Sequence, residues 1–176
     1  PLDSPVILSL DAKALDKMAR SIEQIAAQDD PVGQAVWSTV RPNGMRVERR
    51  RVPLGAVLII FESRPNVTSD AAALCIKSSN AAVLRGGKEA RHSNAAIGAA
   101  LCAAAKSAGL PEHAIQIVEQ TDRAVVNELL TKEGLIDFLS KPAGDVGQQI
   151  SIYKEPASGV DFVLGAGPSA IATDAL

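Results

Sequence analysis

Short apolar runs alternate with longer amphipathic stretches along most of the chain. Residues 56–61 form an unbroken apolar run with a valine- and isoleucine-rich centre, which is typical of a parallel strand covered on both faces. Shorter runs predict strands at 82–84, 115–118 and 135–139, with helices between the strands at 69–80, 94–107 and 122–131. This alternation predicts a Rossmann-like α/β fold, with a doubly wound, mostly parallel sheet and helices on both faces.

The first part of the chain predicts another helix. It begins near Ser9 and Asp11, which suit a helix N-terminus. Its apolar positions recur at helical spacing, at Leu15, Met18, Ile22 and Ile25. We expect this stripe to pack on the core, and a partner interface is the alternative.

The segment after this helix predicts a loop and then an extended stretch. Residues 31–44 have the composition of a loop, with Trp37 inside it and a turn at 41–44. Residues 45–52 are extended and rich in arginine. The arginines favour a solvated edge strand, where charge opposes sheet-to-sheet aggregation, over an anion-binding patch.

Two polar turns follow the first two strands of the predicted sheet. Residues 62–66 bring a carboxylate, a guanidinium and an amide, and residues 85–88 bring two glycines between two cations. In open α/β sheets, ligands bind outside the carboxyl ends of the strands, so both turns are expected to border one groove. Thr68 and Asp70 are expected to open the intervening helix, and Asn80 to end it as a left-handed C-cap.

Composition describes an ordinary globular protein. The 176 residues are 47% apolar with a net charge of −2, which supports neither a nucleic-acid surface nor a disordered tail. No apolar run approaches the length of a membrane helix, and the start lacks a signal-peptide pattern. Cys75 and Cys102 suggest neither a disulfide framework nor a metal site, so a reducing cytoplasm is the expected location.

Four segments carry a family resemblance: 51–55 (RVPLG), 62–68 (ESRPNVT), 70–75 (DAAALC) and 84–87 (LRGG). They resemble the gamma-glutamyl phosphate reductases (glutamate-5-semialdehyde dehydrogenases) of the aldehyde dehydrogenase superfamily, and the likeness is dense from Asp29 to Asp137. The resemblance implies an NADP-binding domain of an oxidoreductase. The family reaction is the NADPH-dependent reduction of L-glutamyl 5-phosphate to L-glutamate 5-semialdehyde, a step of proline biosynthesis.

The resemblance also implies roles for individual residues. Asn66 corresponds to the asparagine that donates its amide to the oxyanion of the tetrahedral intermediate; the alternative is that it only caps the following helix. Further residues are expected to bind NADP(H): on the nicotinamide side Ser63, Arg64 and Pro65; at the adenosine end Arg85, Gly86, Gly87 and Lys88, whose cations suit a 2′-phosphate; and, facing the cofactor and capping the next helix, Thr121.

The family's nucleophile raises a separate expectation. Its members attack the acyl carbon with a cysteine thiolate from a second domain, and neither Cys75 nor Cys102 matches that cysteine. We therefore expect this chain alone to be inactive in the family reaction, as a piece that forms a homo-oligomer or associates with a catalytic half. The alternative is a non-catalytic nucleotide-binding or interaction fragment.

The C-terminal part departs from the family pattern. We expect residues 1–150 to form the NADP-binding domain, with 151–176 of uncertain relation to it. Residues 165–170 read G-x-G-x-x-A after a predicted strand at 161–164, as in a dinucleotide fingerprint. A true fingerprint needs a full helix, a second strand and an acidic residue farther on, so a structural turn is the favoured interpretation.

Overall fold

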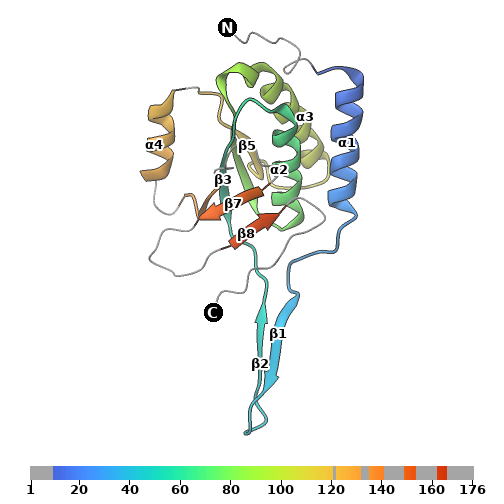
Figure 1. Ribbon diagram of the computed structural model, residues 1–176, viewed down its shortest axis with the longest axis vertical. Coiled ribbons are helices and arrows are strands. Elements are labelled where there is room, and N and C mark those ends of the chain that lie inside the picture. Colours follow the sequence, from blue (N-terminus) through green and yellow to red (C-terminus); the bar gives the residue numbers. More distant parts are fainter. Residues whose placement is uncertain (1–9, 121, 132–134, 141–148, 154–161, 166–176) are drawn as a thin grey trace.

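A six-stranded sheet forms the body of the protein in a computed structural model, which describes residues 10–120, 122–131, 135–140, 149–153 and 162–165. The strands lie in the order β5-β4-β3-β6-β7-β8, with a separate two-stranded sheet made of β1 and β2 (Figure 1). The strands are β1 (Ala35–Val40), β2 (Arg46–Arg50), β3 (Ala56–Ile60), β4 (Ala81–Arg85), β5 (Ile115–Ile117), β6 (Phe138–Ser140), β7 (Gln149–Tyr153) and β8 (Phe162–Gly165). The helices are α1 (Ala12–Ala26), α2 (Pro65–Lys77), the 3₁₀ turn η2 (Lys88–Ala90), α3 (Arg91–Ser107) and α4 (Arg123–Thr131).

The topology confirms the predicted fold class. Strand β3 pairs in parallel with β4 on one side and β6 on the other, and β4 pairs in parallel with β5. Strand β7 pairs antiparallel with both β6 and β8. The sheet thus has three parallel pairs and two antiparallel ones, and is mostly parallel. The strand order reverses between β3 and β6, and in Figure 1 α4 stands on the other side of the sheet from α1. This reversal is typical of a doubly wound sheet.

The core explains why residues 56–61 are apolar throughout. Val57 and Ile59 face the layer of α2 and α3, where they join Ala72 and Cys75 in one buried cluster. Leu58 points to the opposite face and is equally buried. A strand covered on both faces cannot alternate apolar and polar residues, which gives the continuous run.

Helices α1, α2 and α3 form one layer on the sheet. The contacts link α2 to β4, α3 to β5 and α2 to α3, while α1 packs on α2. Asp11 caps α1, its carboxylate accepting the N–H of Ala14 at 2.7 Å. In the predicted stripe of α1, Met18 and Ile25 are buried as expected, whereas Leu15 stays 49% exposed.

The ends of α2 correct two predictions. The helix begins at Pro65, ahead of the predicted Thr68 and Asp70, because proline needs no N–H partner in the first turn. At the other end Ser79, with a φ of 58°, takes the left-handed conformation that we predicted for Asn80. The N–H groups of Ser79 and Asn80 bond back to Ile76 and Cys75, which forms a Schellman cap.

The hairpin of β1 and β2 is the largest correction to the predicted elements. Residues 35–40 form a strand where we predicted a loop, and they pair with the predicted extended stretch across the turn at 41–44. The hairpin projects away from the body (Figure 1). The residues of β1 are mostly exposed. Because this strand has no buried face, the sequence lacks the apolar pattern from which a strand is predicted.

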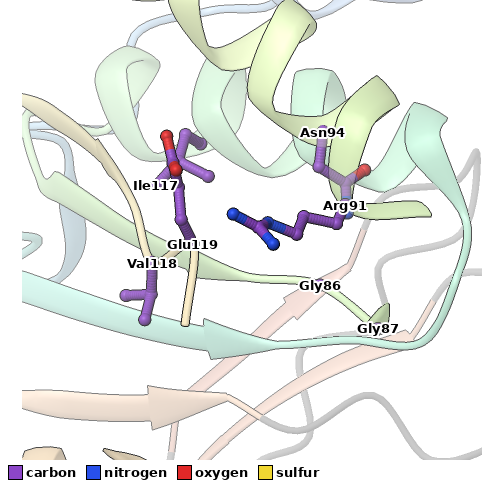
Figure 2. Close-up of a pocket in the computed structure, with 7 residues that line it drawn as sticks. All are labelled: Gly86, Gly87, Arg91, Asn94, Ile117, Val118 and Glu119. Atoms are coloured by element: carbon purple, nitrogen blue, oxygen red, sulfur yellow. The ribbon is translucent and has the colours of Figure 1, made fainter. Parts of the chain in front are cut away.

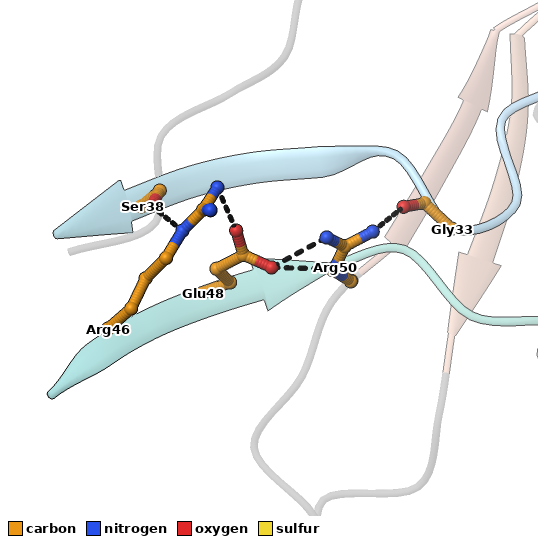
Figure 3. A network of polar contacts seen from close by, with 5 residues as sticks. All are labelled: Gly33, Ser38, Arg46, Glu48 and Arg50. Atoms are coloured by element: carbon orange, nitrogen blue, oxygen red, sulfur yellow. Dashed lines mark hydrogen bonds and ion pairs between the residues drawn. The ribbon is translucent and has the colours of Figure 1, made fainter.

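Polar contacts engage Arg46 and Arg50 of this hairpin. Glu48 forms ion pairs with Arg46 and Arg50, and Arg50 also donates to the carbonyl oxygen of Gly33 at 2.9 Å (Figure 3). The Arg46 side chain reaches Ser38 on the facing strand. Arg50 and Arg46 hold an exposed ribbon together, which favours the solvated-strand interpretation over an anion-binding patch.

In the part of the chain that the structure describes, none of the helices combines the length and the apolar character that crossing a bilayer demands.

Candidate functional site

The two predicted turns leave the same edge of the sheet. Strands β3 and β4 run parallel with Ile60 opposite Arg85, and the N–H of Phe61 donates to the carbonyl oxygen of Arg85 at 3.0 Å. The chain then turns away from both strand ends, into α2 after β3 and into η2 after β4. The expectation that residues 62–66 and 85–88 are neighbours is therefore correct.

A hydrogen bond joins these two turns directly. The Ser63 hydroxyl donates to the Glu89 carboxylate at 2.6 Å, and this bond is the main cause that lowers the pKa of Glu89. Gly87 lies next to this hydrogen bond, and a Cβ added to it would lie 2.4 Å from the Ser63 hydroxyl oxygen. A side chain at position 87 would displace the Ser63 hydroxyl, so glycine lets the two turns approach each other without a shift.

Gly86 has an equally specific neighbour. A Cβ there would lie 2.1 Å from the Asn94 amide nitrogen and 3.0 Å from the Phe61 ring. Asn94 is 4% exposed, and its side-chain oxygen accepts the Thr68 hydroxyl at 3.0 Å. Asn94 on α3 thus connects the start of α2 to the turn after β4. Protein packing accounts for glycine at both positions, and the approach of a ligand to their backbone stays a prediction.

A hollow lies next to this packed region, where β4 and β5 end against α3 (Figure 2). We call it the β4–β5 hollow. Its lining residues are Gly86, Gly87, Arg91, Asn94, Ile117, Val118 and Glu119. Its space for water-sized molecules is only about 10 Å³, roughly what one water needs, so the hollow takes the edge of a ligand and not a whole nucleotide.

Two charged residues of the β4–β5 hollow were not among our predicted site residues. Arg91 is the first residue of α3, and Glu119 follows β5 by two residues. The available signal for Glu119 was its position after a predicted strand, where ligand-binding residues gather in α/β sheets. Arg91 carried no such signal, because its place follows from the start of α3 at residue 91, where the sequence predicted 94.

Asn66 is exposed in the first turn of α2, one residue after Pro65. The N-cap of α2 is Arg64, and no side chain caps the helix. The carboxamide of Asn66 therefore does not serve as the cap that we considered as its alternative role. Asp70, one turn later, has its pKa raised by burial, although Ser21, Asn66 and Lys17 act in the opposite direction.

The other predicted cofactor residues take varied positions. Ser63 is half-buried in its bond to Glu89, Pro65 is buried, and Arg64 is exposed. Arg85 is half-buried and directs its guanidinium to the carbonyl oxygen of Asp122, at 3.5 Å, on the connection before α4. Lys88 is exposed, and it does not line the β4–β5 hollow. Thr121 lies outside the described residues, as do 166–170 of the G-x-G-x-x-A segment.

The thiols and imidazoles offer little for catalysis. Cys75 is fully buried, and burial raises the pKa of its thiol to about 12. Cys102 donates to the carbonyl oxygen of Ile115 at 3.3 Å. His92 and His113 are both exposed. Among the described residues, no three His, Cys, Asp or Glu side chains gather in a way that could hold a metal ion.

Known proteins resemble this chain over most of its length. Curated gamma-glutamyl phosphate reductases from Rhizorhabdus wittichii and Clostridium botulinum are 53% identical over 137 residues and 47% identical over 147 residues. These matches cover 78% and 84% of this chain, and the chain spans about a third of either relative, 32% and 35%. The crystal structure of gamma-glutamyl phosphate reductase from Thermotoga maritima matches with a TM-score of 0.74 at 39% identity, covering 79% of this chain and 34% of that one.

A family model gives the broader assignment. The model of the aldehyde dehydrogenase family matches residues 7–161. This range includes both turns at the β3 and β4 ends, the Ser63–Glu89 bond and the β4–β5 hollow. The chain therefore belongs to the aldehyde dehydrogenase family.

Proposed function

We propose that this chain is the cofactor-binding part of a gamma-glutamyl phosphate reductase, which reduces L-glutamyl 5-phosphate to L-glutamate 5-semialdehyde with NADPH in the cytoplasm, as a step of proline biosynthesis. One observation carries the proposal: the turn with Asn66 and the turn with Gly86 and Gly87 leave adjacent parallel strands at one edge. The identity of about half the residues to two such reductases supports it.

The turn after β3 is proposed to face the reacting end of the cofactor. The nicotinamide supplies a hydride to the acyl carbon when it is bound. Asn66 is exposed at this edge, and its amide N–H would donate to the acyl oxygen as negative charge develops there. A fixed neutral donor of this kind is worth about 3–4 kcal/mol in the transition state of comparable reactions. Ser63, Arg64 and Pro65 would line the same side.

The turn after β4 is proposed to hold the adenosine end of NADP(H). The β4–β5 hollow offers a cation, a carboxylate and two apolar side chains, Ile117 and Val118. The cation suits a phosphate, the carboxylate suits ribose hydroxyls, and the apolar side chains suit the face of a ring. Arg85 and Lys88 border this region from the end of β4, and we propose that Thr121 also faces the cofactor.

The two cysteines make catalysis by this chain alone unfavourable. Cys75 cannot reach a substrate, since it is fully buried, and its raised pKa leaves almost no thiolate at neutral pH. Cys102 lies in α3 and donates to the backbone of β5. We propose that the nucleophile comes from another part of the enzyme, so the partner is a catalytic half or a further copy that carries one.

Calorimetric titration of NADPH into the full 176-residue chain tests the binding role. We expect saturable binding that Arg85→Ala and Lys88→Ala weaken. A parallel assay with L-glutamyl 5-phosphate and NADPH should give no turnover, since Cys75 is buried and Cys102 donates to the backbone of β5. Absence of NADPH binding would favour the alternative of an interaction fragment, and turnover by this chain would contradict the assignment of its cysteines.

A further inference from the structure

We infer that Arg91 selects a 2′-phosphorylated adenosine nucleotide over its unphosphorylated counterpart, with Glu119 as the opposing group in the β4–β5 hollow. This inference rests on the proposed function, since it concerns the same cofactor. It moves the selection to a residue that the sequence had not singled out. The cations that the sequence favoured, Arg85 and Lys88, then contribute less to it.

The position of Arg91 is the first argument. Its side chain extends from the start of α3 across the β4–β5 hollow, toward the end of β5 (Figure 2). In the described ranges, no carboxylate oxygen lies within 4.0 Å of its guanidinium nitrogens. A guanidinium that lines a hollow without an ion pair can accept an anionic ligand without first losing a protein partner.

The nearby carboxylates strengthen this argument. Glu89 is engaged by the Ser63 hydroxyl at 2.6 Å, so it belongs to the bond between the two turns. Glu119 lines the β4–β5 hollow together with Arg91. A carboxylate at the end of a strand accepts ribose hydroxyls but repels a phosphate placed there. Binding of a 2′-phosphate beside Glu119 therefore requires a compensating cation.

Arg91 is better placed for this task than the other two cations. Arg85 lies half-buried at the end of β4 with its guanidinium toward the Asp122 carbonyl, on the connection before α4. Lys88 does not line the β4–β5 hollow. Arginine also binds phosphate through two parallel N–H groups, which a point charge such as lysine cannot do.

The test uses two nucleotides that lack the nicotinamide half, adenosine 2′,5′-bisphosphate and adenosine 5′-monophosphate, titrated into the full chain by calorimetry. Arg91→Ala should weaken binding of the bisphosphate about tenfold or more, as for a lost hydrogen bond to a charged group. Binding of the monophosphate should change less than about twofold. Arg91→Lys should recover part of the loss, and Glu119→Gln should strengthen binding of the bisphosphate.

Lys106→Ala, in the last turn of α3, removes a cation from the same helix away from the hollow and should leave both affinities unchanged. Circular dichroism and thermal melting confirm that each variant folds. If the wild-type chain binds the bisphosphate but Arg91→Ala weakens both nucleotides equally, or neither, the inference about Arg91 is wrong and the proposed function stands. If the wild-type chain binds neither nucleotide nor NADPH, both fall together.

Discussion

Asn80 shows how one side chain can fix the start of a strand. It is 4% exposed, and its carboxamide oxygen accepts the N–H groups of Leu54 and Gly55, the latter at 3.0 Å. Its amide donates to the Ser78 hydroxyl at 2.8 Å. The residue that the sequence suggested as a left-handed cap instead ties the end of α2 to the segment that enters β3.

Asn80→Ala should lower the free energy of unfolding by about 2–3 kcal/mol, because two backbone N–H groups lose their acceptor in a poorly solvated place. Asn80→Asp keeps an acceptor oxygen and should cost less. Urea denaturation measures both variants. Asn43→Ala is the control, since Asn43 accepts one N–H, from Met45, in an exposed turn. Equal losses for Asn80→Ala and Asn43→Ala would contradict this role.

The two cysteines should differ in reactivity. Burial raises the pKa of the Cys75 thiol to about 12, so at pH 8 nearly all of it is protonated as well as inaccessible. In native protein, a thiol reagent should therefore modify Cys102, which is partly exposed, well before Cys75. Mass spectrometry of the Cys75→Ser and Cys102→Ser variants identifies the site, and denatured chain should react at both. Rapid native labelling of Cys75 would contradict its burial.

Single residues of the site were predictable to different degrees. The polar turns around Asn66, Gly86 and Gly87 follow apolar runs, so their place at a strand end could be read from the sequence. Arg91 and Glu119 line one hollow only because β4 pairs with β5 and α3 begins beside that pair. Such pairing depends on long-range contacts, and the spacing of the residues along the chain does not encode it.

At the scale of elements, the contact of α1 with α2 contains a titrating group. Asp70 on α2 is half-buried, and burial raises the pKa of its carboxyl, against the effects of the Ser21 hydroxyl, the Asn66 amide and the Lys17 charge. A carboxyl with a raised folded-state pKa binds a proton more tightly in the folded than in the unfolded chain. Its ionisation therefore destabilises the fold as pH rises from the unfolded-state pKa through the folded-state pKa.

Asp70→Asn should remove this penalty. The variant should be more stable than the wild type at pH 7, and the gain should shrink at pH 3, where the wild-type carboxyl is protonated in both states. Thermal melting at the two pH values measures the difference. Asp16→Asn on the exposed face of α1, where Asp16 pairs with Arg20, is the matched control and should show no such gain at pH 7. A gain that is equal at both pH values would rule out Asp70 ionisation as its source.

Most elements that the sequence predicted have a buried face, and β2, predicted as an extended stretch at 45–52, is an exception. The strands β3, β4 and β5 and the helices α1 and α3 followed from apolar runs and helical spacing, with ends that moved by a few residues. Strand β1 was missed because its residues are mostly exposed and pairing with β2 alone holds it. The start of α2 was predicted too late in the chain, because the proline at which the helix begins was assigned to the polar turn.

The whole molecule combines a layered body and a projecting hairpin, and this division could not be predicted. The alternation of strands and helices along the chain describes the body, which is why the fold class was predicted correctly. The hairpin is connected to the body by the segments before β1 and after β2, and its contacts are local (Figure 1). Hydrophobic patterning describes burial, so it predicts the body and does not predict β1, the strand that completes the hairpin.

The position of Trp37 follows from this division and affects how unfolding can be observed. The only tryptophan of the chain lies on β1 and is 50% exposed, away from the buried cluster around β3. A two-stranded ribbon is at best marginally stable alone. We expect indole emission to change at lower temperature than the far-ultraviolet circular dichroism of the helices, and iodide to quench it in native protein. Coincident melting curves would contradict this expectation. Two transitions in this protein would reflect where its single fluorophore resides, and would be no sign of a folding intermediate in the body.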